Sequence, residues 1–259
     1  MSAKIDELNE YLSTGIHEVN GWCNTQLWRS IWPLYNLIGP GPMAEIGVYE
    51  GKFFIGLAKT FSNPDHKAVA IDVFDMQEFN LDKAGIGKVD VLLENNKKNN
   101  VNIDSIEIKR ADSLHLDRID SSKFVSDFGK VKFFSVDGCH TVLHTTKDIE
   151  YAMAVTAPEG VIAVDDFLNP FWPGVVEAVT KMYLLNEYPF VPFLYVRNKL
   201  FLCSETKRET YMNAIYDYNK KHHPKDRLKF VTRYGYKTLS IKPDNQDTVL
   251  QVIEDANKS

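Results

Sequence analysis

The sequence has few cysteines, and they form no pattern that would hold a metal or a disulfide framework. Its 259 residues include three cysteines, Cys23, Cys139 and Cys203, which are odd in number and widely spaced. Neither a C-x-x-C pair nor a zinc-ligand spacing occurs among them. Because disulfides are rare in reducing compartments, this cysteine usage favours a cytoplasmic protein.

Long hydrophobic runs and an excess of basic residues are also missing. No apolar run reaches the length that crosses a membrane, and the N-terminus (MSAKIDELNEYL) is charged and lacks a signal-peptide core. The formal net charge is −5, so nothing in the composition attracts a polyanion. We therefore expect neither a membrane nor a nucleic-acid partner. Internal repeats and low-complexity linkers are absent as well.

The remaining composition is that of an ordinary globular protein, with 44% hydrophobic and 25% charged residues. This length is enough for one sizeable α/β domain with additions. Apolar, β-branched runs predict strands at 43–46, 66–73, 105–111, 131–136, 160–164, 190–196 and 199–203. Helical spacing of apolar residues predicts helices over 5–38, 52–61, 89–99, 143–157, 175–185 and 207–221, and residues 230–241 are expected to be extended.

Strands that alternate with helices and finish in an antiparallel pair predict an α/β fold of the Rossmann-like type. We expect a seven-stranded sheet that is mostly parallel with an antiparallel last strand, and helices on both faces. The Gly39-Pro40-Gly41-Pro42 cluster ends the first helical region sharply. The predicted organisation is an N-terminal helical extension (1–42), a central domain (43–205) and a C-terminal helical and extended addition (206–259).

The central feature of the chain is the strand at 43–46, which breaks into a turn with two glycines and is followed by a helix and a second strand that ends at Asp72. This order is typical of the first half of a nucleotide-binding α/β unit, in which the terminal acid can accept both hydrogens of a ribose diol. The glycines lie in the pattern Glu45-x-Gly47-x-x-x-Gly51. A G-x-G-x-x-G dinucleotide pattern is absent, which disfavours an NAD-linked oxidoreductase. Acids at Glu45 and Glu50 repel phosphate but suit a cationic, zwitterionic ligand.

This stretch resembles the first motif of class I S-adenosylmethionine (SAM) methyltransferases, although any Rossmann-like turn is the simpler alternative. The resemblance implies a methyltransferase sheet with SAM across the ends of the first strands. The cofactor-binding residues that it implies are Glu45, Gly47, Tyr49, Gly51, Asp72, Asp112, Ser113 and Asp137, with Asp112 and Ser113 at the adenine position.

A second group of polar residues follows the fourth and fifth predicted strands. Asp137 ends the fourth strand, His140 comes three residues later, and Asp165 and Asp166 end the fifth. If the two strands are neighbours, the three carboxylates converge, and their mutual repulsion calls for a cation. Oxygen ligands select Mg²⁺, with Mn²⁺ or Ca²⁺ as substitutes. His140 is then placed to take a proton from a substrate hydroxyl. Considered singly, such acids more often cap helices and such a histidine is solvated.

Three motifs together resemble the metal-dependent sugar O-methyltransferases of the macrocin and mycinamicin type. They are Asp-Gly-x-His at 137–140, Val-Asp-Asp-Phe at 164–167 and Asn-Pro-x-Trp-Pro-Gly-Val at 169–175. The resemblance covers roughly residues 43–203. It implies Mg²⁺ on Asp137, Asp165 and Asp166, His140 as general base, and a small-molecule hydroxylated acceptor, a sugar or a glycosylated natural product.

Other functions remain open at this level. The same metal-and-acid arrangement resembles the cephalosporin hydroxylase-like branch, a catechol-type acceptor is compatible, and a non-catalytic SAM-binding subunit is a further alternative. A nucleic-acid methyltransferase is disfavoured, since the basic stripe and the Asn/Asp-Pro-Pro-aromatic motif expected of it are missing.

Two long loops, 74–88 and 168–174, are expected to line the acceptor site because they follow strand ends. Their candidate acceptor contacts are Asn80, Asp82, Asn169 and Trp172. Trp22, Trp28 and Trp32 form either a lid over the substrate or, as we favour, a packing stripe against the domain or a second subunit, which leaves a homo-oligomer possible.

Overall fold

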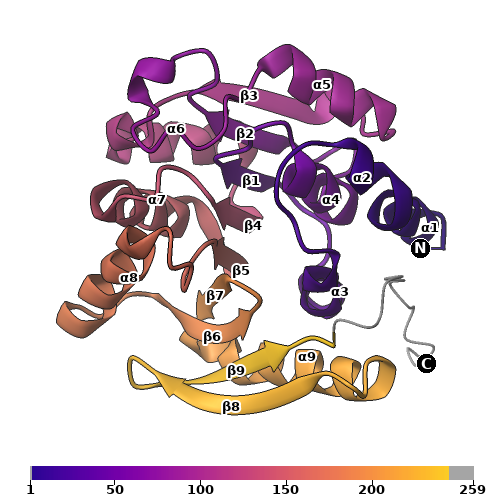
Figure 1. Ribbon diagram of the computed structural model, residues 1–259, viewed down its shortest axis with the longest axis vertical. Coiled ribbons are helices and arrows are strands. Elements are labelled where there is room, and N and C mark those ends of the chain that lie inside the picture. The colour runs from indigo at the N-terminus through magenta and orange to yellow at the C-terminus, as the bar shows by residue number, and fades with distance from the viewer. Residues whose placement is uncertain (1, 245–259) are drawn as a thin grey trace.

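A nine-stranded mixed sheet forms the centre of the computed structural model, which describes residues 2–244 (Figure 1). Its order is β3-β2-β1-β4-β5-β7-β6-β9-β8. The first five strands in this order pair in parallel, and β7 is antiparallel to both β5 and β6. The strands are β1 (Met43–Ile46), β2 (Ala68–Asp72), β3 (Ile106–Arg110), β4 (Val131–Val136), β5 (Thr156–Val164), β6 (Phe190–Val196), β7 (Lys199–Ser204), β8 (Arg227–Arg233) and β9 (Tyr236–Lys242).

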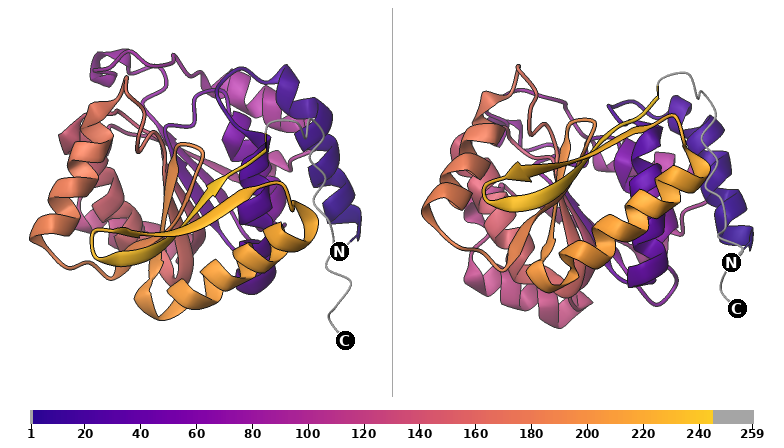
Figure 2. Two further views of the ribbon diagram at one scale, coloured as in Figure 1. Left: turned by 60° about the horizontal axis from the view of Figure 1, so that its bottom comes forward. Right: turned by 90° about the horizontal axis from the view of Figure 1, so that it is seen from below.

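The seven expected strands are all present, and the sheet is mostly parallel with an antiparallel β7, as predicted. The difference is at the far edge, where the hairpin β8–β9 continues the sheet beyond β6 (Figure 2). Residues 230–241, which were expected to be extended, therefore belong to two paired strands. Residues 245–259, the end of the predicted C-terminal addition, lie outside the described residues.

Helices cover both faces of the sheet, as the sequence predicts (Figures 1 and 2). The apolar residues of the helices on one face share a core with β1 and β6, and those on the other face share a core with β4 and β5. On the first face are α1 (Ser2–Glu10), α2 (Ile16–Glu18), α3 (Trp28–Ile38), α4 (Lys52–Phe61), α5 (Val89–Lys98) and α9 (Arg208–His222); on the second are α6 (Arg118–Phe128), α7 (Val142–Val155) and α8 (Pro173–Leu185).

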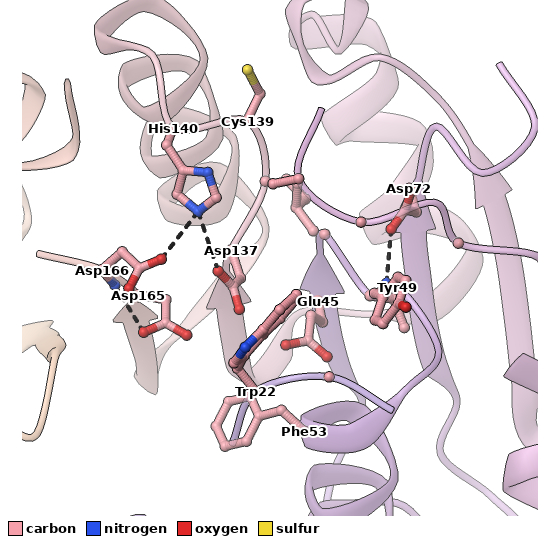
Figure 3. A pocket seen from close by; sticks show the side chains of 18 of the residues that line it. Trp22, Glu45, Tyr49, Phe53, Asp72, Asp137, Cys139, His140, Asp165 and Asp166 are labelled. Carbon is pink, nitrogen blue, oxygen red and sulfur yellow. Dashed lines mark hydrogen bonds and ion pairs between the residues drawn. The ribbon is translucent and has the colours of Figure 1, made fainter. Parts of the chain in front are cut away.

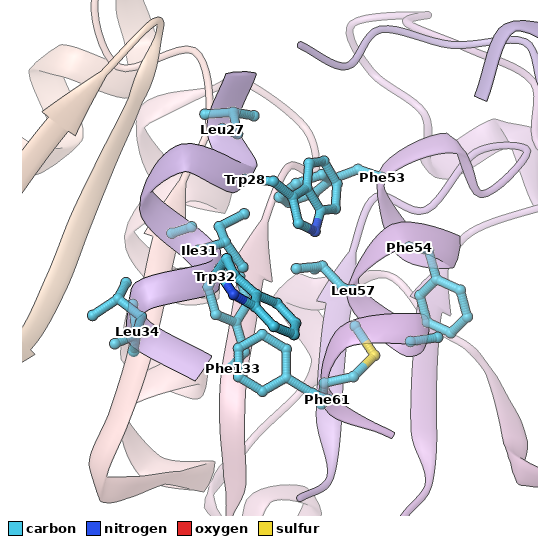
Figure 4. Close-up of a cluster of buried hydrophobic side chains, with 14 of the residues drawn as sticks. Leu27, Trp28, Ile31, Trp32, Leu34, Phe53, Phe54, Leu57, Phe61 and Phe133 are labelled. Carbon is cyan, nitrogen blue, oxygen red and sulfur yellow. The ribbon is translucent and has the colours of Figure 1, made fainter. Parts of the chain in front are cut away.

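The N-terminal region is not one continuous helical segment, because it breaks between α2 and a short 3₁₀ turn before α3. Gly21, with φ +122°, lies in this break. Beyond it, Trp28 and Trp32 are buried against α4, and the indole nitrogen of Trp28 donates to the Thr60 hydroxyl at 3.0 Å (Figure 4). The packing interpretation is therefore right for these two tryptophans. Trp22 is 82% exposed and so does not pack within the domain core, and its packing against a second subunit stays a prediction.

The two terminal additions pack on the central sheet and on each other. Arg29 of α3 forms a buried ion pair with Asp226, which precedes β8, at 2.6 Å. The Asn219 side chain of α9 donates to the Arg29 carbonyl at 3.0 Å. One hydrophobic core includes residues from all three predicted parts of the chain, so the additions brace the strands whose ends form the site.

Candidate functional site

A cavity of about 660 Å³ lies at the carboxyl ends of the parallel strands, where ligands bind in open α/β sheets. Figure 3 shows side chains of both predicted groups around it. The predicted site residues that line this cavity are Glu45, Gly47, Tyr49, Asp72, Asp112, Ser113, Asp137, His140, Asp165 and Asp166. Gly51 does not line it; this glycine begins α4 with φ +92°, and a Cβ there would lie 2.5 Å from Leu92 Cδ1.

Gly47 joins the two halves of the site. Its φ is +83°, and a Cβ at this position would lie 1.8 Å from the carbonyl oxygen of Asp137. A side chain would therefore collide with the backbone of the Asp137 turn as well as adopt an unfavourable conformation. The glycine is needed because the turn after β1 packs directly on the turn after β4.

Asp72 is fixed by the backbone of two turns. One carboxylate oxygen accepts from the Tyr49 amide at 2.9 Å, and the other accepts from the Phe74 amide at 2.9 Å. Burial raises the pKa of Asp72, and the bonds from the amides oppose this shift. Tyr49 itself has φ +52°, a strained conformation for a non-glycine residue that is typical of ligand-binding turns. The indole of Trp22 stacks on the Tyr49 ring at 6.1 Å, over the mouth of the cavity.

Glu45 and the Asp112–Ser113 pair also have partners within the protein. Glu45 is buried and accepts from the Ser135 hydroxyl at 2.9 Å; burial and the nearby Asp137 charge raise its pKa well above the usual range. Asp112 accepts from the Leu114 amide at 3.1 Å and so begins a 3₁₀ turn. The cofactor contacts of these residues stay a prediction.

His140 is the centre of the second group. Its Nε2 lies 3.2 Å from a carboxylate oxygen of Asp166 and 3.8 Å from one of Asp137, while its Nδ1 lies 2.6 Å from Asp82 Oδ2. The ring stacks on Trp172 at 4.4 Å with an interplanar angle of 16°. Burial alone would lower the pKa of His140, but bonds with Asp137, Asp166 and Asp82 outweigh it and raise the pKa to about 12. This shift favours the protonated ring, whose positive charge balances part of the carboxylate charge.

Asp166 is oriented by amide side chains. One of its oxygens accepts from Asn169 at 2.9 Å and from Asn198 at 2.8 Å, and the other oxygen faces His140. Its φ of +54° is a further strained position beside the cavity. The alternative role as a helix cap is not observed, since α8 begins without a side-chain cap bond among the described residues.

Asp165 lies in a different environment from the one expected. Its carboxylate forms an ion pair with the buried Lys199, whose ammonium group also lies 4.0 Å from Asp137 and 4.4 Å from the centre of the Phe53 ring. Burial and repulsion from Asp137 raise the pKa of Asp165 to about 7, and Lys199 opposes the shift. Burial alone would lower the pKa of Lys199, but Asp165 and Asp137 raise it above its usual range.

The possible metal ligands therefore differ from the expected set. The ligand atoms that come within 4.8 Å of one another belong to Asp137, His140 and Asp166. Asp165 is not in this group, and its carboxylate pairs with Lys199 instead. Its role as a metal ligand stays a prediction.

Sequence reasoning missed several residues of the cavity wall. Lys199 opens an apolar strand, and a lysine in such a position is seldom buried without a partner, so this signal was available. Asp82, Asn169 and Trp172 do line the cavity as expected, but the structure gives each a partner in the His140–Asp166 group. Asn80 also lines the cavity.

Within residues 2–244, none of the helices combines the length and apolar character needed to cross a membrane.

Residues 44–167 match a family model described as a methyltransferase domain. Similar solved structures include the O-methyltransferase NovP, with a TM-score of 0.55, 14% identity, and 78% of this chain and 98% of that chain covered. The O-methyltransferase TomG from Streptomyces achromogenes, in complex with SAM, has a TM-score of 0.54 and 14% identity over 77% of this chain and 90% of that one.

MycE of the mycinamycin biosynthetic pathway, in complex with Mg, S-adenosylhomocysteine (SAH) and mycinamycin VI, has a TM-score of 0.53 and 15% identity. That match covers 76% of this chain and 54% of MycE. At these identities the similar structures establish the fold alone. A comparison of the sequence with curated proteins found no match.

Proposed function

We propose that this chain is a SAM-dependent methyltransferase that transfers a methyl group to a hydroxyl of a small molecule with the help of a divalent cation. The match of residues 44–167 to a methyltransferase-domain model supports this proposal. The acceptor that we propose is a sugar or a glycosylated natural product. The observation that carries the proposal is the meeting of Asp137, His140 and Asp166 in the same cavity that Asp72 lines.

The cofactor half of the cavity suits a zwitterionic nucleoside ligand. The fixed carboxylate of Asp72 ends β2, where a ribose diol binds in sheets of this kind. Acidic side chains at Glu45 and Asp112 disfavour phosphate at either side of it. When bound, SAM supplies an electrophilic methyl group, which passes to the acceptor oxygen while the electron pair of the broken carbon–sulfur bond stays on sulfur.

The reaction half of the cavity fits a hard divalent cation. Asp137 and Asp166 supply carboxylate oxygens, which suit Mg²⁺, Mn²⁺ or Ca²⁺. Nε2 of His140 is buried and faces both carboxylates, at 3.2 Å from Asp166 and 3.8 Å from Asp137. A bound cation at these carboxylates supplies positive charge that lowers the pKa of an acceptor hydroxyl and lets His140 lose its proton.

The protein's own groups then perform the proton transfer. His140 Nε2 removes the hydroxyl proton, and the resulting oxygen nucleophile attacks the methyl carbon from the side opposite to sulfur. Asn169 and Asn198 hold Asp166 in place during this step. A sugar acceptor is supported by the polar and aromatic lining of the cavity mouth, which includes Asn80 and Trp172.

The test begins with calorimetric titration of SAH, first in EDTA and then in Mg²⁺ or Mn²⁺, with NAD as a control. SAH release is then measured with methyl glycosides that carry vicinal hydroxyls and with catechol as acceptors. We expect micromolar SAH binding, separate cation binding and cation-dependent turnover. Absence of SAH binding in every buffer would contradict the proposal.

The base assignment is tested with His140→Ala, and His17→Ala is the matched control because that side chain is exposed and does not line the cavity. We expect His140→Ala to keep its SAH affinity and to lose about 10²–10⁴-fold in turnover. The control should keep both. Unchanged turnover in His140→Ala would remove His140 from this role.

A further inference from the structure

We propose that Asp82 is a positioning residue that fixes the His140 ring for proton removal and connects loop 74–88 to the reaction centre. The inference rests on the proposed function, in which His140 is the base. Asp82 belongs to the loop between β2 and α5, and 58 residues separate it from His140 in the chain.

Two contacts from one carboxylate oxygen hold His140. Oδ2 of Asp82 accepts from the His140 backbone amide at 2.9 Å and lies 2.6 Å from the ring Nδ1. Both side chains are largely withdrawn from water, with 9% of Asp82 and 10% of His140 exposed. Because the oxygen binds both the backbone and the ring of the same residue, it restricts rotation of the imidazole.

The third restraint on the ring is Trp172, which stacks on its face at 4.4 Å. With Nδ1 directed at Asp82, the other nitrogen, Nε2, is the one that faces Asp137 and Asp166. A carboxylate that binds one imidazole nitrogen selects the ring form whose other nitrogen can accept a proton. Asp82 therefore presents Nε2 at the place where an acceptor hydroxyl is expected.

The same loop packs on the cofactor half of the cavity. The Asn80 side chain donates to the Gly85 carbonyl at 2.8 Å and so folds the loop on itself. A Cβ at Gly85 would lie 3.0 Å from the Tyr49 ring, so the loop backbone rests directly on this tyrosine. The Tyr49 amide in turn binds Asp72. Loop 74–88 thus connects the cofactor acid to the base.

The test uses Asp82→Asn, which keeps the size of the side chain but removes the charge. Asp75→Asn is the matched control, since Asp75 lies on the same loop and pairs with Arg110 at the exposed surface. We expect Asp82→Asn to lower kcat at least about tenfold, and by no more than the 10²–10⁴-fold that a general base supplies. The KM for SAM and the SAH dissociation constant should stay within about threefold. The control should behave as the unmodified protein.

A double-mutant cycle with His140→Ala separates positioning from a merely structural role. If Asp82 acts through His140, Asp82→Asn has no further effect on kcat once His140 is replaced. An equal loss of kcat in the presence and absence of His140 would overturn the inference, and so would unchanged turnover in Asp82→Asn. Should this variant not fold, as judged by SAH binding, Asp82→Ser takes its place in the cycle.

A measurement without turnover distinguishes failure of this inference from failure of the proposed function. In protein labelled with ¹⁵N-histidine, the Nδ1 proton of His140 should give a sheltered, low-field NMR signal that Asp82→Asn abolishes and Asp75→Asn retains. An inactive protein that shows this pattern would refute the proposed function and keep the Asp82–His140 pairing. If the signal persists in Asp82→Asn as it does in Asp75→Asn, the pairing itself is overturned.

Discussion

The buried ion pair between Lys199 and Asp165 allows a quantitative prediction about the stability of the site. Only 3% of the Lys199 side chain and 9% of the Asp165 side chain are exposed, and Asp137 lies 4.0 Å from the same ammonium group. Lys199→Met keeps most of the aliphatic stem and removes the charge. Asp165 is then buried beside another carboxylate without a cation, and breaking a buried pair in this way costs about 3–5 kcal/mol.

The assay is urea denaturation followed by far-UV circular dichroism in EDTA. Lys147→Met is the matched control, because Lys147 pairs with Glu150 on the exposed side of α7 and such pairs contribute about 0–1 kcal/mol. The double variant Lys199→Met with Asp165→Asn should recover much of the lost stability, since no unpaired charge is left buried. A loss below about 1 kcal/mol in Lys199→Met would refute the reasoning.

The same variant tests why Asp165 lies outside the cluster of possible metal ligands. With Lys199 replaced, the Asp165 carboxylate is free to bind a cation beside Asp137 and Asp166. We therefore expect Mn²⁺ to raise the free energy of unfolding more in Lys199→Met than in the unmodified protein, as linkage requires for tighter binding to the folded state. Equal stabilisation of both proteins would show that Lys199 does not compete with the metal.

Two further predictions concern the cofactor half. Gly47→Ala should lower SAH affinity at least about tenfold, because its Cβ meets the Asp137 carbonyl, and should destabilise the protein by more than the roughly 1–2 kcal/mol of a left-handed alanine. Gly235→Ala is the control, since Gly235 has the same φ of +83° and a Cβ there would contact no other described part of the chain. Equal losses in the two variants would contradict the collision. Asp72→Asn should weaken SAH binding about tenfold in calorimetry while Mn²⁺ affinity stays unchanged, and unaltered SAH affinity would remove Asp72 from the cofactor site.

The central strands could be predicted from the sequence because they are buried on both faces. Such strands read as continuous apolar runs, and β4 and β6 begin and end where the pattern predicts. The outer elements carry weaker signals. In β8 no residue is fully buried, and α6 buries only Ser121 and Phe124, so neither has a clear period in hydrophobicity. For that reason the extended stretch 230–241 was not resolved into two strands, and this helix was missed.

For the site too, residues with a local sequence signal could be predicted, whereas contacts between distant parts of the chain could not. Asp72, Asp137 and Asp166 could be placed because strand ends meet at one edge of a parallel sheet, whatever the details of packing. The residues that contact these acids in the folded site could not be predicted. Asp82 contacts His140 across 58 residues of chain, which depends on how loop 74–88 settles on the finished sheet. Lys199 contacts Asp165 across 34 residues, which depends on the pairing of β7 with β5.

The charges of the folded site explain why these missed partners matter. Three carboxylates at strand ends would repel one another, and the sequence alone assigns their neutralisation to a metal. In the structure Lys199 pairs with Asp165, and the raised pKa of His140 favours its positively charged form, so the protein offers two positive charges of its own. The carboxylates can therefore assemble before any cation arrives. A divalent ion has to compete with His140 for Asp137 and Asp166, and this competition would convert His140 from a counter-charge into a base. Cation binding and base activation are then expected to be one event.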